Sequence, residues 1–308
     1  MSENDINKKI LFPNYFDEWI AKYEKSDVAR QTFITHYSAQ KEVSEYFEGI
    51  KISDITKNVF QKFLNDFAET HAKSTVRGLS VNVGMVLKDA VSEGILDKDP
   101  TFRVKINGHA SKDSSQKFLE ESDFNNMVHH IENYPLNRWL MIIYTTALSG
   151  MRISETFALT MNDIDFRNNT ISVTKSKTAH RPFEFVKPKT NSSIRHIEMP
   201  NKFFDQLNRY ISECSPLDEH IFGETSDTRA VGKHLSSLLT SIGASKIISP
   251  HGLRHTHASI LLNHDVDIKY VSARLGHSSI SVTQNVYTHL LSSKRDLEAG
   301  RTLDILGQ

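Results

Sequence analysis

The sequence predicts a mainly α-helical protein with a small three-stranded β-sheet, divided into two domains. Apolar residues recur at helical spacing through most of the 308 residues. Alternation typical of strands is confined to residues 168–199, and a polar segment without periodicity at 105–117 separates two more apolar parts. A chain of this length can bury a core in each part.

The first domain, residues 1–104, is expected to consist of four helices. Helical spacing of apolar side chains covers residues 12–23, 29–47, 55–67 and 79–90. Thr56 is a suitable N-cap for the third segment, and Gly94 follows the fourth at a position where glycine commonly ends a helix. The sequence shows no strand pattern between these helices.

Residues 105–117 are rich in Ser, Lys and Gly and are predicted to form a linker, which leaves 118–308 as a mixed α/β second domain. Helices are expected at 120–132, at 136–148 before Gly150, and at 154–160. Strands are expected at 168–174, 181–186 and 195–199, and the remainder is predicted to be helical again.

Composition excludes several classes of protein. Apolar residues make up 38% and charged residues 24% of the chain, as in ordinary soluble proteins. No apolar stretch could span a bilayer and the N-terminus is polar, so we expect a cytoplasmic protein with no membrane partner. The single cysteine, Cys214, excludes an internal disulfide and a Cys-rich zinc module.

Charge gives only a local signal, because 37 basic residues balance 37 acidic ones. The segment 174–195 is strongly basic and holds one acidic residue, Glu184. Its basic residues are Lys175, Lys177, Arg181, Lys187, Lys189 and Arg195. Since a run of like charge is usually a solvated surface, this segment gains meaning only from its context.

Residues 249–259 bring three histidines and an arginine together, and a metal site, a buried turn and an anion site compete as explanations. His251 and His255 are spaced i, i+4, as two metal ligands on a helix can be. However, Gly252 stands where the zinc-hydrolase pattern requires Glu, and the cluster has no carboxylate. No metal is expected, and His255 and His257 are predicted to point away from any ligand into the core.

The same segment carries the signals of a helix N-terminus that binds an anion. Ser249 is a suitable N-cap and Pro250 fits the first helical position. His251 and Arg254 then lie on one side of the helix. Free N–H groups, the positive end of the helix and an arginine fork together suit a phosphate.

Cleavage of a phosphodiester needs further groups, and the chain has candidates for them. Arg152 and Glu155 belong to the motif G-x-R-x-S-E, His277 ends the motif L-G-H, and Tyr287 comes ten residues later. A capping-box pattern at 281–284 predicts a helix that presents Tyr287. Taken singly these signals are weak, because a tyrosine on a helix is usually a packing residue.

In this order, with the basic segment 174–195 between them as a β-hairpin, the motifs resemble those of the tyrosine recombinases, the phage-type integrase family. The similarity covers about residues 10–300 and is greatest to integrases of Gram-positive phages and conjugative elements. It implies that the first domain is a SAM-like, core-binding domain and that the two domains hold double-stranded DNA. It also implies recombination without any cofactor or metal.

The resemblance assigns the reacting groups residue by residue. In the family, two arginines hold the non-bridging oxygens of the scissile phosphate, and here these match Arg152 and Arg254. Tyr287 matches the nucleophile that forms a 3′-phosphotyrosine link, and Lys189 matches the acid that protonates the departing 5′ oxygen. The neighbouring cations favour a phenolate, and the energy of the broken bond is kept in the Tyr–DNA link.

The remaining family positions have supporting roles. His251 is expected to take part in proton transfer with Tyr287, and His277 to bind the phosphate or position its neighbours. Glu155 is expected to orient a catalytic residue. Lys189 is preferred over the other hairpin lysines because it precedes a threonine just ahead of the last strand. DNA contacts are expected from Lys73, Arg77, Lys175, Lys177 and Lys187.

The resemblance also bears on assembly. In the family the C-terminal tail, here residues 291–308, often docks on a neighbouring subunit, so a tetramer on two DNA sites is expected. A frayed terminal helix is the alternative. Accessory DNA-bending or excision factors are possible partners, and arm-site binding is not expected because the chain begins near its first domain.

Other functions stay open at this point. A chromosome-dimer-resolving recombinase would have the same layout, and a type IB topoisomerase would share the chemistry. A DNA-binding protein with an idle recombinase fold is disfavoured by the full set of site residues. A histidine-based metal hydrolase is disfavoured by the missing carboxylate ligands.

Overall fold

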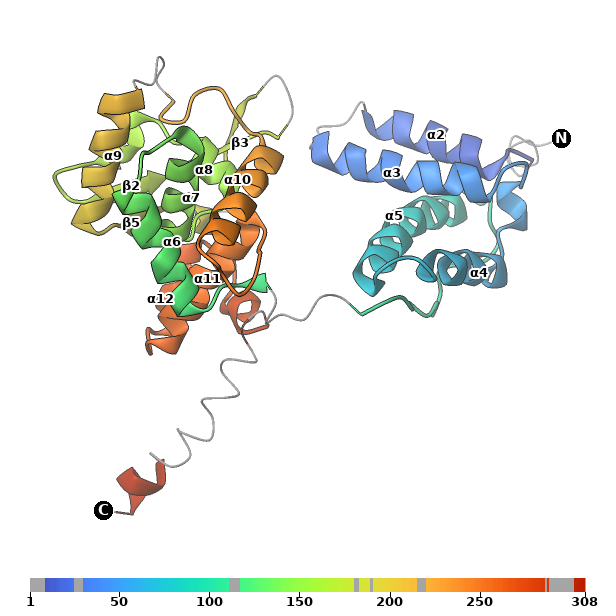
Figure 1. Ribbon diagram of the computed structural model, residues 1–308. Coiled ribbons are helices and arrows are strands. Elements are labelled where there is room, and N and C mark those ends of the chain that lie inside the picture. Colours follow the sequence, from blue (N-terminus) through green and yellow to red (C-terminus); the bar gives the residue numbers. More distant parts are fainter. Residues whose placement is uncertain are drawn as a thin grey trace. The chain divides into compact units, whose positions relative to one another are not determined.

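A computed structural model describes residues 9–24, 30–110, 117–179, 183–188, 191–214, 220–285, 287 and 302–307. The chain divides after residue 111 into two compact units, and each has its own hydrophobic core (Figure 1). The mainly helical class with a small antiparallel sheet, predicted from the sequence, is confirmed.

The N-terminal unit is helical, as predicted. Its elements are α2 (Phe12–Glu24), α3 (Arg30–Tyr46), η1 (Ile52–Asp54), α4 (Lys57–Ala68) and α5 (Lys73–Ser92). Helix α3 packs against α2 and α5, and α4 packs against α5. Thr56 caps α4 by accepting a hydrogen bond from the Val59 amide at 3.4 Å, and Gly94 follows α5 with a φ of 73°. Both capping predictions are confirmed.

The first part of the predicted linker belongs to the N-terminal unit. The Lys105 amide donates to the Gln61 side chain at 2.7 Å, Ile106 packs against the core, and His109 pairs with Ala72. Residues 105–110 therefore run along α4 and the start of α5. An extended polar segment held by backbone hydrogen bonds has no apolar periodicity, which is why the sequence suggested a linker. Residues 111–116 lie outside the described residues.

The C-terminal unit is built around one buried helix, α7 (Arg138–Ser149). The helices that pack against it are α6 (Glu121–Asn133), α8 (Ile153–Phe157), α9 (Asn201–Cys214), α10 (Thr228–Ser241) and α11 (Pro250–Asn263). Helix α12 (Ile268–Leu275) packs on α11 (Figure 1). Because Met141, Ile142 and Ile143 are all fully buried, α7 has no solvent-facing stripe in this stretch, as expected for a central helix.

A three-stranded antiparallel sheet has the order β1–β2–β5, with β1 at Ile164–Asp165, β2 at Thr170–Val173 and β5 at Arg195–Glu198. Ile171 lies opposite Ile197. The predicted strand at 181–186 is not in this sheet: it contributes β4 (Phe185–Val186), which pairs with β3 (Ser176–Lys177) in a separate ribbon. Both residues of β4 are exposed, so its alternation does not mark a core face. Strand β1 was not predicted, because its two residues are too few to show an alternating pattern.

Candidate active site

Glu155 joins two guanidinium groups at the start of α8. Its carboxylate accepts hydrogen bonds from the Arg152 side chain and the Arg152 backbone amide, each at 2.8 Å. It also accepts bonds from both terminal nitrogens of Arg195, at 2.8 and 3.3 Å. Burial acts to raise the pKa of Glu155, but hydrogen bonds and charge from Arg195 and Arg152 outweigh it and lower that pKa. The carboxylate therefore stays ionised and fixes the Arg152 fork.

Arg195 extends this network to the turn that carries His277. Its Nε donates to the Arg274 carbonyl at 2.7 Å, and Arg152 Nη2 donates to the Gly276 carbonyl at 3.2 Å. A Cβ on Gly276 would lie 2.9 Å from Arg195 Nη1, so this approach requires glycine. Sequence reasoning gave Arg195 no such role. The available signal was its alternation in phase with buried Ile197, because a charged residue on a buried strand face needs a partner.

Arg254 is buried on the second turn of α11. Pro250 is the first residue of this helix, as predicted, although the Ser249 side chain accepts no capping hydrogen bond. Arg254 Nη1 donates to the Gly150 carbonyl at 2.8 Å, whereas Nη2 has no hydrogen-bond partner within the described part of the chain. Burial, followed by the charge of Arg152, lowers the Arg254 pKa to about 9. A buried cation with a free donor is stabilised by an incoming anion.

Gly150 supports Arg254 and can be tested by substitution. Its φ is +69°, and an added Cβ would lie 2.6 Å from His257 Cδ2. Gly150→Ala is expected to lower the free energy of unfolding by about 1–3 kcal/mol for the left-handed backbone and by a further 1–3 kcal/mol, roughly, for overpacking. Gly243→Ala is the matched control, because Gly243 has a φ of +68° with nothing within 4 Å. Urea unfolding of both variants measures the difference, and equal losses would contradict the steric argument.

One of the three histidines of α11, His255, does not lie as predicted. His251 is exposed, and desolvation together with the charges of Arg254 and Arg152 lowers its pKa. His255 was expected to point into the core, but its Nδ1 lies 3.0 Å from the Tyr287 hydroxyl and its ring stands at 88° to that of His251. That expectation is wrong because residues i, i+3 and i+4 share one helix face. His257 is buried as predicted, with Nδ1 3.0 Å from the Ala147 carbonyl.

Tyr287 and His277 complete the cluster from the segment after α12. The chain is helical at 280–285 and at 287, and Ser279 Oγ accepts from the Ser281 amide, so the N-cap lies two residues before the predicted one. The Tyr287 ring is 1% exposed and packs with Leu262, Val271 and Leu275. Burial raises the Tyr287 pKa and Arg254 partly lowers it. His277 Nδ1 lies 2.8 Å from Thr283 Oγ1.

Electrostatic contacts tie these residues into one site. Burial, then the charges of Arg254 and Arg152, lower the pKa of His277 to about 4. The same two arginines act on His251, and Arg254 acts on Tyr287. Two guanidinium groups, three imidazoles and one phenol therefore converge, although they come from segments more than a hundred residues apart in the sequence.

The basic hairpin is only partly described. Lys189 lies outside the described residues. Lys175 Nζ pairs with Asp163 at 2.5 Å, so a protein carboxylate already holds its charge. Lys177 is buried with its Nζ 3.4 Å from the Gly223 carbonyl, and its contact with DNA stays a prediction. Sequence patterning could not reveal this burial, because Lys177 stands in an otherwise basic and polar run. Lys187 is exposed, as are Lys73 and Arg77 on α5.

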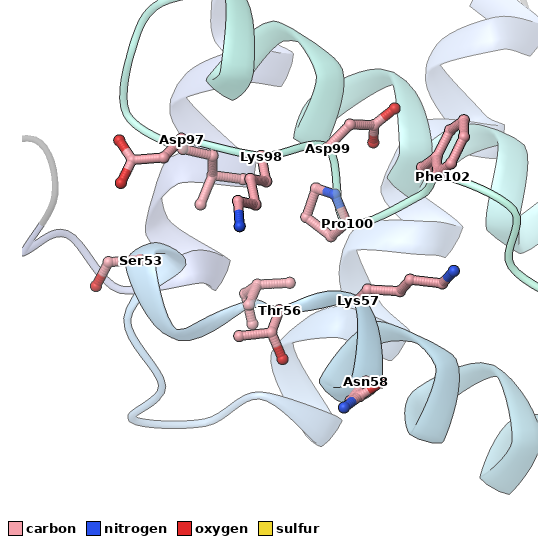
Figure 2. A pocket seen from close by; sticks show the side chains of 11 residues that line it. Ser53, Thr56, Lys57, Asn58, Asp97, Lys98, Asp99, Pro100 and Phe102 are labelled. Atoms are coloured by element: carbon pink, nitrogen blue, oxygen red, sulfur yellow. The ribbon is translucent and has the colours of Figure 1, made fainter.

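Two hollows differ in chemistry. One of about 320 Å³ lies beside Arg152 and has cationic and hydroxyl groups in its wall; its lining is Arg152, Ser154, Glu155, Lys175, Ser176, Pro188, Ser193, Gly276 and Ser278. A larger one, of about 700 Å³, lies in the N-terminal unit between the start of α4 and residues 96–102 (Figure 2). There Lys57 and Lys98 are offset by Asp97 and Asp99, and no predicted site residue lines it. Of these two hollows in the described part of the chain, the one beside Arg152 suits a phosphate.

The described residues contain neither a metal-binding cluster nor a membrane-spanning helix. No group of three or more His, Cys, Asp or Glu side chains there could hold a metal ion. No helix among them is long and apolar enough to cross a membrane.

A helical unit followed by a mixed α/β unit that gathers Arg, His, Arg, His and Tyr in one site defines the class of tyrosine recombinases. Residues 117–294 match the model of the phage integrase family, and residues 11–106 match the phage integrase SAM-like domain. The chain belongs to the phage integrase family and is a site-specific DNA recombinase.

Known proteins are similar over nearly the whole chain. The ICEBs1 integrase of Bacillus subtilis (strain 168) is 27% identical over 317 residues, which cover 97% of this chain and 84% of the relative. The Tn1549 transposon integrase, solved in complex with transposon right end DNA, superposes with a TM-score of 0.79 at 18% identity, covering 94% of this chain and 99% of that one. A lambda integrase tetramer bound to a Holliday junction gives a TM-score of 0.68 at 14% identity, covering 89% and 77%. The two solved integrase structures share the fold of this chain.

Proposed function

We propose that the protein breaks and rejoins double-stranded DNA through a covalent 3′-phosphotyrosine link at Tyr287, and so integrates and excises a mobile element. The observation that carries this proposal is the buried Arg254, whose Nη2 has no partner within the described part of the chain. Arg152 and the Tyr287 hydroxyl belong to the same site. A phosphodiester brings the negative charge that these groups lack.

The proposed step is a transesterification. Arg152 and Arg254 hold the two non-bridging oxygens. The Tyr287 oxygen loses its proton, with His251 taking part in the transfer as in the family, and bonds to phosphorus. The bond from phosphorus to the 5′ oxygen breaks. Lys189 gives that oxygen its proton, and His277 donates to the phosphate. The 5′ hydroxyl of another strand later reverses the step, so neither ATP nor a cofactor is consumed.

Assembly forms part of the proposal. We infer that four copies act in the cytoplasm on two DNA sites, with accessory DNA-bending or excision factors. Support comes from the lambda integrase tetramer bound to a Holliday junction. In addition, Leu303, Ile305 and Leu306 near the C-terminus are each at least 72% exposed, which leaves an apolar surface for a second subunit to cover.

Covalent capture tests the proposed function with no target sequence specified in advance. Nicked duplexes with randomised arms are incubated with the protein in excess EDTA, and adducts that survive SDS are recovered and sequenced. The expected result is a family of related DNA sites attached to the protein. Absence of any adduct, or an adduct that forms only with added Mg²⁺, would contradict the proposal.

A further inference from the structure

The Tyr287 hydroxyl is held by a histidine that the mechanism above does not use. His255 Nδ1 lies 3.0 Å from that oxygen, and the two rings are 6.0 Å apart between centroids. The tyrosine ring is almost fully buried and packs with Leu262, Val271 and Leu275, so its hydroxyl has little freedom to change partner. Within the described part of the chain, His251 makes no hydrogen bond to this oxygen.

His255 is neutral in the free protein, so one of its ring nitrogens can accept a hydrogen bond from the Tyr287 hydroxyl. Burial, then the charges of His251, Arg254 and Lys117, lower its pKa to about 4. The imidazole is therefore neutral at neutral pH, and with the hydroxyl as donor its Nδ1 is the free acceptor. A bound phosphate would oppose the charge of Arg254, and so would make His255 more basic when a proton has to leave Tyr287.

We propose that His255, rather than His251, is the catalytic residue that accepts the Tyr287 proton during DNA cleavage, an inference that rests on the proposed function. As the Tyr287 oxygen bonds to phosphorus, its O–H bond breaks and the proton passes to His255 Nδ1. The electron pair of the broken P–O bond leaves with the 5′ oxygen. That oxygen takes a proton from the general acid, which is proposed above to be Lys189. In the reverse reaction His255 returns the proton to Tyr287.

His251 then acts on the proton acceptor instead of on the nucleophile. Its ring meets that of His255 edge to face at 4.8 Å between centroids. His251 is exposed on the otherwise buried first turn of α11, on the face shared with Arg254. Replacing each histidine by asparagine separates the two roles, because the asparagine oxygen occupies the place of Nδ1 and accepts a hydrogen bond but does not take up the proton.

The experiment uses full-length protein and a nicked duplex selected with the wild type. Single-turnover cleavage is measured against pH for His255→Asn, His251→Asn and the control His264→Asn, an exposed histidine at the C-cap of the same helix. Each is made with Tyr287 and with difluorotyrosine at position 287, which ionises at lower pH. His255→Asn is expected to cleave about 10²–10⁴-fold more slowly, with a rate that climbs steadily with pH.

Rescue identifies the proton acceptor. The more acidic phenol is expected to restore much of the rate of His255→Asn while changing wild type and His264→Asn little. The inference is overturned if His255→Asn cleaves like wild type, or if His251→Asn alone shows the loss and the rescue. Absence of any wild-type adduct would instead refute the proposed function itself.

A second measurement does not require the His255→Asn variant to fold. The Tyr287→Phe protein removes only the hydroxyl, and the nitrogen-15 signal of His255 Nδ1 is compared with that of the wild type. A shift of this signal with the His251 signals unchanged is expected. An unmoved His255 signal would mean that the hydrogen bond does not exist in solution, and this too would overturn the inference.

Discussion

Tyr287→Phe is expected to abolish covalent attachment to DNA while leaving DNA binding unchanged. Phenylalanine keeps the buried ring among Leu262, Val271 and Leu275 and removes only the hydroxyl. The lost hydrogen bond to His255 is expected to cost the fold about 1 kcal/mol. Affinity for DNA is expected to depend mainly on contacts between phosphates and cationic side chains, so the effect is expected to fall on chemistry alone.

Covalent attachment to DNA and affinity for DNA are measured separately on labelled duplexes. Adduct is read after SDS denaturation, and affinity is read from equilibrium binding of an intact duplex. Tyr270→Phe, on α12 and 49% exposed, is the control that removes a phenol elsewhere. Adduct formed by Tyr287→Phe at a normal rate would show that another residue is the nucleophile.

Arg254→Met is expected to slow cleavage by about 10²–10³-fold or more while leaving stability unchanged or increased. Within the described part of the chain Nη2 of the buried guanidinium has no hydrogen-bond partner, and burial and the charge of Arg152 lower its pKa more than Glu155 raises it, so the free protein bears the cost of a poorly compensated charge. A methionine of similar length removes that charge. The loss of activity is therefore not accompanied by a loss of stability, as expected where a site is arranged to bind an anion.

Arg195→Met is the matched control. Arg195 is also buried but is paired with Glu155 at 2.8 Å, and its loss strands part of a buried carboxylate. Breaking such a pair is expected to cost about 3 kcal/mol. Guanidinium chloride unfolding of both variants gives the comparison. A large loss of stability in Arg254→Met, equal to that in Arg195→Met, would contradict the account of Arg254 as an unpaired cation.

Much of the fold could be predicted because its helices carry strong local signals. Apolar periodicity located α2, α4, α6 and α7, and glycines at 94 and 150 end helices where they were expected to. The errors fall on segments whose structure depends on distant partners. Residues 105–110 are ordered by α4 and α5, and β4 pairs in an exposed ribbon instead of joining the sheet. Neither interaction leaves a periodic trace in the sequence.

For the site, motif order anticipated which residues would come together but not how they would bond. The predicted Arg152, Glu155, Arg254 and Tyr287 belong to one cluster in the structure. The contact between His255 and the Tyr287 hydroxyl was not predicted. The i, i+3 spacing placed His251 and Arg254 on one helix face, but the i, i+4 position on that same face, His255, was assigned to the core. Arg195 was missed because its partner Glu155 lies 40 residues away in the sequence.

The identity of the residue that carries the DNA tests the account most directly. The covalent adduct is digested with nuclease and protease, and its peptides are sequenced by mass spectrometry. We expect a nucleotide joined through its 3′ phosphate to the peptide containing Tyr287, and a free 5′ hydroxyl on the released strand. A nucleotide on any other residue, or a 5′-phosphate link, would contradict it.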